Sequence, residues 1–326
     1  MTPTDITEIS NAIILNKEHP ATAKYLYSKK EVDGLISSGL SLEALFDNIK
    51  WFQKLKDKKI IIPSNKIIDV FRGTRTGGDD IFITDGLMTD NEDSHPYLKS
   101  TRHVKSLFIK STNKYLFYTE DTIEKLNKKH HTKTLEYINS ISNSPRAKKQ
   151  KDKHGDRWYI LEDTPKYSDF CTTINPDKRL FWGAFEEPTA VNQRVVAARV
   201  KQDYAKEKGL IHALLNSAIS LYALSGLGFA RAEGVTDLTS NSVKNLMILN
   251  PDLLTQTSKN NILKKWNVVK DKNVVSIFDT LKDPDWITFN KEIIKSYNLN
   301  DNLFDEVKDE IFKLLTRRDN IKNSKS

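Results

Sequence analysis

An apolar run that opens into a glycine-rich loop constrains the fold of this chain more than any other feature. Residues 59–71 are rich in isoleucine, and the loop from Arg72 to Gly78 holds three Gly, two Thr and two Arg before a second apolar run at Ile81–Ile83. We interpret the runs as strands and the loop as a place where backbone amides, hydroxyls and guanidinium groups approach a polyanion. A β-hairpin closed by glycines, with no ligand, explains the stretch equally well.

The alternation of helical and strand-like patterns divides the chain into segments. Residues 1–58 are polar with apolar residues at helical spacing, which predicts a helical amino-terminal segment. Residues 59–255 mix strand-like and helical runs, residues 256–318 are amphipathic, and residues 319–326 form a polar tail that we expect to be frayed. We therefore predict an α+β fold, with a mixed strand–helix domain flanked by helices at both ends.

The central segment also carries local predictions. The polar stretch 142–155 is expected to be a mobile loop or a nucleic-acid contact, and Gly209–Leu227 is expected to form one strong helix. A helical pattern is also expected at 121–140, and a short helix from Asn241 to Leu249, where Pro251 follows as a stop signal. Expected strands cover 80–84, 104–109, 114–118 and 180–185.

The charge balance favours a polyanionic partner. The formal net charge is +8 and the isoelectric point is about 9.2, although a Lys- and Asn-rich composition gives surplus charge without any function. The single Cys171 excludes an intramolecular disulfide and fits a reducing compartment, where we expect it to be a buried small residue. No stretch approaches a membrane span and no signal pattern opens the chain, so we expect a cytoplasmic protein.

No catalytic motif is evident. His130 and His131 are adjacent and cannot share one helix face, so solvated histidines explain them better than a metal site. The Glu-x-Lys spacing of Glu306 and Lys308 occurs in nucleases, but here it lies on an amphipathic helix among other charges. Asp283–Trp286 is similar to the Asp-Pro-Pro-Trp of amino-methylating enzymes, yet a helix entry is the better interpretation. We expect neither a catalytic nor a metal site.

Several basic stretches interleave with hydroxyl and aromatic residues, as in proteins that bind DNA. Lysine and arginine contacts to phosphates give affinity, whereas Arg, Asn, Gln, Ser and Thr at base edges give specificity. Surface charge alone is the alternative for any one of them. The candidates are the segment 99–105, then Arg146, Lys148, Lys149, Arg157, Asn192, Gln193 and Arg194.

Short blocks that begin with Gly73–Gly77 and Tyr97–Val104 and end with Leu246–Pro251 follow one another along the chain. Their order resembles the target-recognition domain of type II and type IIG adenine-N6 DNA methyltransferases of restriction–modification systems. Gly73–Gly77 looks like its Gly-x-x-Thr-Gly opening, and the resemblance covers about residues 60–255. The further blocks, in the family's order, are Tyr97–Val104, Tyr115–Tyr118, Arg157–Leu161, His212–Ser217 and Leu246–Pro251.

The resemblance implies sequence-specific recognition of duplex DNA. It places the recognising side chains at Arg72, Thr74, Arg75, Thr76, Arg102 and Lys105. The family's upstream catalytic domain binds S-adenosylmethionine and holds the flipped adenine with an Asn-Pro-Pro-Tyr motif, which this chain lacks along with the cofactor glycine loop. The cofactor is therefore expected on a partner subunit or on a domain outside this chain. An endonuclease of unrecognised type, and a partner-binding helical protein that touches DNA incidentally, are the open alternatives.

Overall fold

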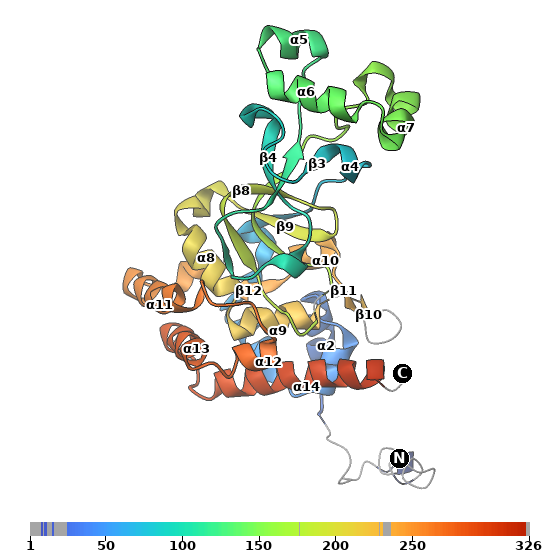
Figure 1. Cartoon of the computed structure of the whole chain (residues 1–326). Coiled ribbons are helices and arrows are strands. Elements are labelled where there is room, and N and C mark those ends of the chain that lie inside the picture. The colour runs from blue at the N-terminus through green and yellow to red at the C-terminus, as the bar shows by residue number, and fades with distance from the viewer. Residues whose placement is uncertain are drawn as a thin grey trace.

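A mixed sheet lies between helical ends in the computed structural model, which describes residues 8, 10, 11, 15, 25–175, 177–227, 229–230 and 236–323. Figure 1 shows helices α5 (Ile123–Lys128), α6 (Thr132–Ile141) and α7 (Pro145–His154) at one end of the molecule and the long helix α14 (Leu303–Asn323) at the other. The expected α+β class is confirmed.

The main sheet of the described residues joins its strands in the order β2, β9, β7, β8, β4, β6 and β3, with β5 also paired to β8. β4 and β5 run parallel to β8, and the other pairs are antiparallel. Val195–Ala198 in β9 are all buried, which indicates that both faces of the sheet are covered there. The strands are β2 (Ile68–Arg72), β3 (Ile83–Thr84), β4 (Ser94–Leu98), β5 (Phe108–Ile109), β6 (Lys114–Phe117), β7 (Tyr167–Thr173), β8 (Gly183–Val191) and β9 (Val195–Val200).

The other elements surround this sheet. Two short antiparallel pairs join β1 (Ile61–Pro63) to β12 (Met247–Leu249) and β10 (Phe229–Ala230) to β11 (Thr236–Asp237). The remaining α-helices are α2 (Lys29–Ser37), α3 (Lys50–Asp57), α4 (Asp79–Phe82), α8 (Lys208–Leu215), α9 (Ala218–Gly226), α10 (Ser240–Lys244), α11 (Gln256–Val269), α12 (Ile277–Thr280) and α13 (Pro284–Ser296). The 3₁₀ turns are η1 (Leu42–Phe46), η2 (Ser64–Lys66), η3 (Asn91–Asp93), η4 (Thr101–His103), η5 (Gly155–Arg157), η6 (Gln202–Glu207) and η8 (Pro251–Leu253).

Two hydrophobic cores hold these elements together. The larger one packs helices α3, α8, α9, α11, α13 and α14 against the central strands, with Trp182 and Trp266 among its largest buried side chains. The smaller one lies under α4, α6 and α7, and within it the Phe117 ring contacts the rings of both Phe82 and Tyr137. The helical end formed by α5–α7 therefore has a core of its own.

The strand expected at 80–84 is wrong in its first part. Asp79–Phe82 forms the single helical turn α4, and β3 follows at Ile83–Thr84. The turn starts after Gly78, and the Thr76 hydroxyl donates to the Asp79 carboxylate at its first residue, 2.6 Å away. Three consecutive apolar residues are too few to separate a strand from a helical turn by periodicity. The strands expected at 104–109 and 180–185 begin later, at Phe108 and Gly183, and a strand, β12, replaces the end of the helix expected over 241–249.

The polar stretch 142–155 is a helix, not a loop. Ser144 caps α7 by accepting from the Ala147 amide at 3.1 Å, Pro145 occupies the first turn, and Gly155 ends the helix at a φ of +57°. Ala147 is the buried residue of this helix, so its sequence shows no apolar stripe. The expectation of a mobile loop is therefore wrong, because the capping signals and one small buried residue are enough to form a helix here.

The apolar run Gly209–Leu227 forms two helices where one was expected. The chain breaks at Asn216 and Ser217, and Ser217 caps α9 by accepting from the Ser220 amide. No helix in the described part of the chain is both long and apolar enough to cross a membrane alone. The bent pair Gln202–Leu215 and Ala218–Gly226, with 72° between its halves, meets that length and composition requirement when taken together.

Buried ion pairs join the two helical ends of the chain. Arg317 on α14 forms a two-pronged pair with the buried Asp47, and Arg318 donates twice to Glu43, each time at 3.0 Å. Such pairs fix orientation because breaking one leaves a charge without a partner inside the protein. α14 also continues to Asn323, so residues 319–323 are helical where a frayed tail was expected from residue 319.

His212 on α8 makes the fold sensitive to acid. The side chain is buried, its Nε2 lies 2.8 Å from the Trp182 carbonyl, and burial lowers its pKa to about 3. An unfolded histidine titrates near 6.5, so the unfolded chain binds more protons between these values and the stabilisation is lost as the pH falls below about 6.5. We expect stability to drop by about 2 kcal/mol between pH 7.5 and pH 5 from this residue.

Urea unfolding at several pH values measures this loss. His212→Gln keeps a donor for the Trp182 carbonyl but cannot become charged, so its stability should depend less on pH than that of the wild type. His130→Asn, at an exposed position, serves as the control. Equal pH dependence in the wild type and the His212 variant would contradict the assignment.

Candidate nucleic-acid interface

The glycine-rich loop is joined to the turn between β8 and β9 by main-chain hydrogen bonds. The Thr74 amide donates to the Val191 carbonyl at 2.7 Å, and the Gln193 amide donates to the Thr74 carbonyl at 3.1 Å. Gly73 makes this approach possible, because a Cβ atom at this position would lie 2.2 Å from the Asn192 carbonyl oxygen. The structure thus brings together the loop and the Asn192–Arg194 turn, which are far apart in the sequence.

The two threonines of the loop face its interior. Thr74 and Thr76 are each 7% exposed, and Thr76 directs its hydroxyl at Asp79. The Thr74 hydroxyl is buried without a hydrogen-bond partner among the described residues. In this conformation both residues shape the loop and present little surface to a ligand.

Three arginines brace the backbone around the loop. Arg72 donates through Nε to the Gln193 carbonyl at 3.1 Å, and Arg146 on α7 donates to the Gly77 carbonyl. Arg179 was not singled out by the sequence, which offers no motif around it, yet it donates to the carbonyls of Thr101, Arg102 and Val104. These guanidinium groups hold the loop and the η4 segment in place.

A first hollow lies between the loop and α7. It has a volume of about 420 Å³ and is lined by Arg75, Thr76, Arg146 and Lys149, with the apolar side chains of Phe82 and Leu161 also in its wall. Two acidic residues, Glu162 and Asp163, line the same hollow; Glu162 forms an ion pair with Lys153 at 3.2 Å, and its carboxylate lies 3.4 Å from the His154 Nε2 atom. Cationic groups therefore outnumber acidic ones around this opening.

Two further hollows are lined by predicted residues. One of about 780 Å³ is lined by Arg102, Asn192, Gln193 and Arg194, and its wall includes Asp79, whose carboxylate accepts from the Thr76 hydroxyl in the wall of the first hollow. The other, of about 1030 Å³, shares Lys99, Ser100 and Arg102 with it and is also lined by Lys105. Nine of the thirteen predicted residues line these hollows, and Thr74 lies in the glycine-rich loop without lining any of them. The others are Arg72, which donates to the Gln193 carbonyl, and Lys148 and Arg157.

Several predicted cations on this side of the molecule have no ion pair or side-chain hydrogen bond within the described part of the chain. They are Arg75, Arg102, Lys105, Lys148, Lys149, Arg157 and Arg194. Each is exposed, and α7 adds a net positive charge because it holds five Lys or Arg and one Asp. Unpaired cations at and beside these hollows suit a ligand that carries regularly spaced negative charges.

Comparison with known proteins gives one kind of match. No family model and no curated protein matches this chain. Among solved structures, the type IIG restriction endonuclease BpuSI has a similar fold, with a TM-score of 0.55 and 12% sequence identity, over 96% of this chain and 39% of that chain. The fold is similar to part of a restriction endonuclease. This chain spans well under half the length of that protein.

The blocks that carried the sequence resemblance divide into surface and scaffold. Gly73–Gly77 and Leu98–Arg102 border the hollows, whereas Trp158, Tyr159 and Leu161 belong to the smaller core. The block His212–Ser217 is buried throughout and holds the start of β8. The blocks of the resemblance therefore include residues that pack the core as well as residues on the surface.

The weak catalytic candidates have structural roles. The Asp283 carboxylate caps α13 by accepting from the Asp285 and Trp286 amides, which confirms the helix entry. Lys308 pairs with Asp305, and Glu306 is exposed on α14. Cys171 is buried as expected, and burial raises the pKa of its thiol to about 12, which disfavours the reactive thiolate form.

Proposed function

We propose that this chain recognises a specific sequence in double-stranded DNA and positions an adenine-N6 DNA methyltransferase on it, as the specificity part of a restriction–modification enzyme. The observation that carries the proposal is the group of hollows beside the glycine-rich loop that are lined by cations without a partner among the described residues. The fold, similar to part of a type IIG restriction endonuclease, supports it. The chain lacks the motifs that bind S-adenosylmethionine, so the proposal assigns that cofactor to a partner subunit or a further domain.

The proposed interface divides into two kinds of contact. Arg75, Arg102 and Arg194 stand at the hollows, and guanidinium forks there are suited to guanine O6 and N7 in the major groove. Lys148 and Lys149 lie on the exposed side of α7 and are suited to the phosphate backbone, which gives affinity without sequence information. The backbone that carries the proposed base-contacting side chains is braced by Arg72, Arg146 and Arg179, which keeps those side chains on a fixed surface.

Selection of bound duplexes from a randomised DNA pool by the purified chain tests the proposal. An enriched motif of a few base pairs, obtained at near-physiological salt, would support sequence reading by this chain alone. Binding without enrichment would indicate that the chain contacts only DNA phosphates, and it would contradict sequence recognition by this chain alone. Absence of binding would reject the proposed DNA interface and favour a protein partner for this surface.

Arg75→Ala is expected to reduce discrimination between the selected site and unrelated DNA by about 1–3 kcal/mol, since Arg75 has no partner among the described residues and stands at the first hollow. The matched control replaces Lys148 and Lys149 together by alanine. That variant should bind all sequences more weakly and reduce the slope of log K against log salt by about 2. Competition binding over a range of salt concentrations separates the two effects. If the Arg75 variant discriminates between sequences as well as the wild type does, Arg75 does not contribute to sequence recognition.

A further inference from the structure

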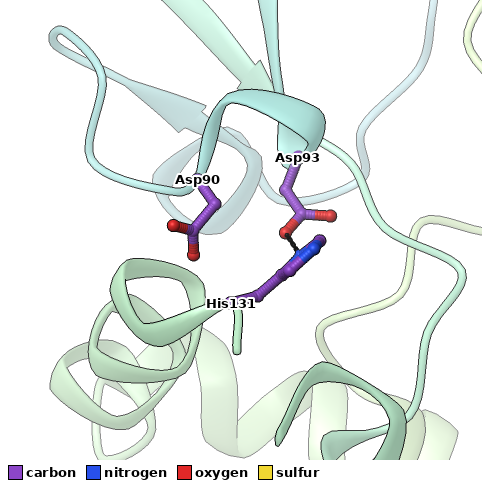
Figure 2. Close-up of side chains that lie close together, drawn as sticks. All are labelled: Asp90, Asp93 and His131. Atoms are coloured by element: carbon purple, nitrogen blue, oxygen red, sulfur yellow. Dashed lines mark hydrogen bonds and ion pairs between the residues drawn. The ribbon is translucent and has the colours of Figure 1, made fainter. Parts of the chain in front are cut away.

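A histidine and two aspartates converge where the helical end of the molecule meets the sheet. Asp90 precedes η3 and Asp93 ends it, while His131 stands at the start of α6; Figure 2 shows the three side chains close together. One possible ligand atom from each lies within 4.8 Å of the others. Asp93 is 4% exposed and the His131 side chain 14% exposed, so the expectation of a solvated histidine is wrong for His131.

The chain turns sharply to aim His131 inward. His130 has a φ of +60° and is exposed, whereas His131 directs Nδ1 at the Asp93 carboxylate, 2.7 Å away. A residue in the left-handed region reverses the local direction of the chain, so adjacent histidines face different ways. This turn removes the objection that two neighbouring histidines cannot share a helix face, because one of them is sufficient here.

Thr134 holds both carboxylates in position. Its hydroxyl donates to Asp93 at 2.7 Å and its amide donates to Asp90 at 3.0 Å. Hydrogen bonds from a neighbouring residue that orient the ligands are a regular feature of metal sites. The same bonds also cap α6, so capping by itself is the competing explanation of the cluster.

We propose that Asp90, Asp93 and His131 bind a divalent transition-metal ion such as Zn²⁺. Three atoms up to 4.8 Å apart share a point about 2.8 Å or less from each, so a small inward movement reaches the roughly 2.0–2.2 Å of zinc bonds to nitrogen and oxygen. One imidazole and two carboxylates form a ligand set that favours Zn²⁺ over Mg²⁺, which prefers oxygen ligands in an octahedron. Two carboxylates also balance the charge of the ion.

The ion would tie the sheet to the helical end. Asp90 and Asp93 lie beside β4, and His131 begins α6, which leads through a short turn to α7. Coordination of one ion by the aspartates beside the strand and by the histidine at the helix fixes the helices against the strands. It also stabilises the folded form over the unfolded one. The role is structural and does not depend on the proposed DNA recognition.

Equilibrium dialysis of the chelator-treated full chain against Zn²⁺ tests the site. We expect one strongly bound Zn²⁺ per chain and a higher Tm with Zn²⁺ than with chelator. Asp90→Asn keeps an oxygen that accepts from the Thr134 amide, so it preserves the cap while removing a charged ligand, and affinity should fall at least about tenfold. His131→Gln should have a similar effect. His130→Asn is the matched control, because asparagine tolerates the left-handed conformation at this exposed position.

The two explanations differ in the Asp90 variant. A cap without a metal predicts that Asp90→Asn has the Tm of the wild type, with or without Zn²⁺. The proposal is overturned if the wild type binds no Zn²⁺ at micromolar concentration, or if both the Asp90 and His131 variants bind it as the wild type does. Binding of Mg²⁺ as strong as that of Zn²⁺ would overturn the assignment to a transition metal.

Discussion

Gly73→Ala is expected to destabilise the protein by about 3 kcal/mol and to abolish discrimination between DNA sequences. A Cβ atom at Gly73 would lie 2.2 Å from the Asn192 carbonyl oxygen, 2.4 Å from that of Val191 and 2.6 Å from the Asn192 carbonyl carbon. All three are backbone atoms of the strand end and the turn that follows it, so no side-chain rotation relieves the overlap. The loop must then separate from the turn and lose the bonds at Thr74.

Gly209→Ala is the matched control. Its Cβ would meet one side-chain atom of Leu263 at 3.7 Å, an ordinary contact, and alanine is favoured over glycine in a helix, so stability should stay equal or rise by up to about 1 kcal/mol. Urea midpoints measure the stabilities, and competition binding at a temperature where both variants are folded measures discrimination. A Gly73 variant that is as stable and as selective as the wild type would show that the loop and the turn do not need this close approach.

The sequence predicts the architecture better than the site because the two depend on different information. Apolar spacing is a local pattern, and the amphipathic segment expected at 256–318 does form helices, among them α11, α13 and α14. The pairing of the loop with the Asn192–Arg194 turn joins residues more than a hundred positions apart, and no local pattern encodes it. Arg72 and Arg146 therefore resembled ligand-binding residues in the sequence, whereas the fold uses them to brace the backbone.

The errors in secondary structure have physical causes. α7 exposes nearly all its side chains and is specified by its caps, so a search for apolar stripes misses it. The break between α8 and α9 lies inside a continuous apolar run, and its cause is a tertiary contact of Asn216. Periodicity shows which faces of a helix are buried, but it does not show where a side chain forms hydrogen bonds with backbone groups and so ends the helix.

Asn216→Ala is expected to destabilise the protein by about 3–5 kcal/mol, because it removes a buried clamp on the backbone of Trp182. The Asn216 Oδ1 atom accepts from the Trp182 amide at 2.9 Å, and Nδ2 donates to the Trp182 carbonyl at 2.9 Å and to the His212 carbonyl at 3.0 Å. Asn216 and Trp182 are both fully buried, so no water replaces these bonds. The Trp182 amide would be left without a partner next to the first residue of β8.

Two further variants separate hydrogen bonding from volume. Asn216→Asp has nearly the same shape but loses the donor and places a carboxylate against the Trp182 carbonyl, so it should be at least as unstable as the alanine variant. Asn139→Ala, at an exposed position of α6, should change stability by less than about 0.5 kcal/mol. Urea unfolding with unchanged m-values gives the comparison. A stable Asn216→Asp variant would mean that side-chain volume, and not the clamp, holds β8 against α8, and the break in the apolar run would then need another cause.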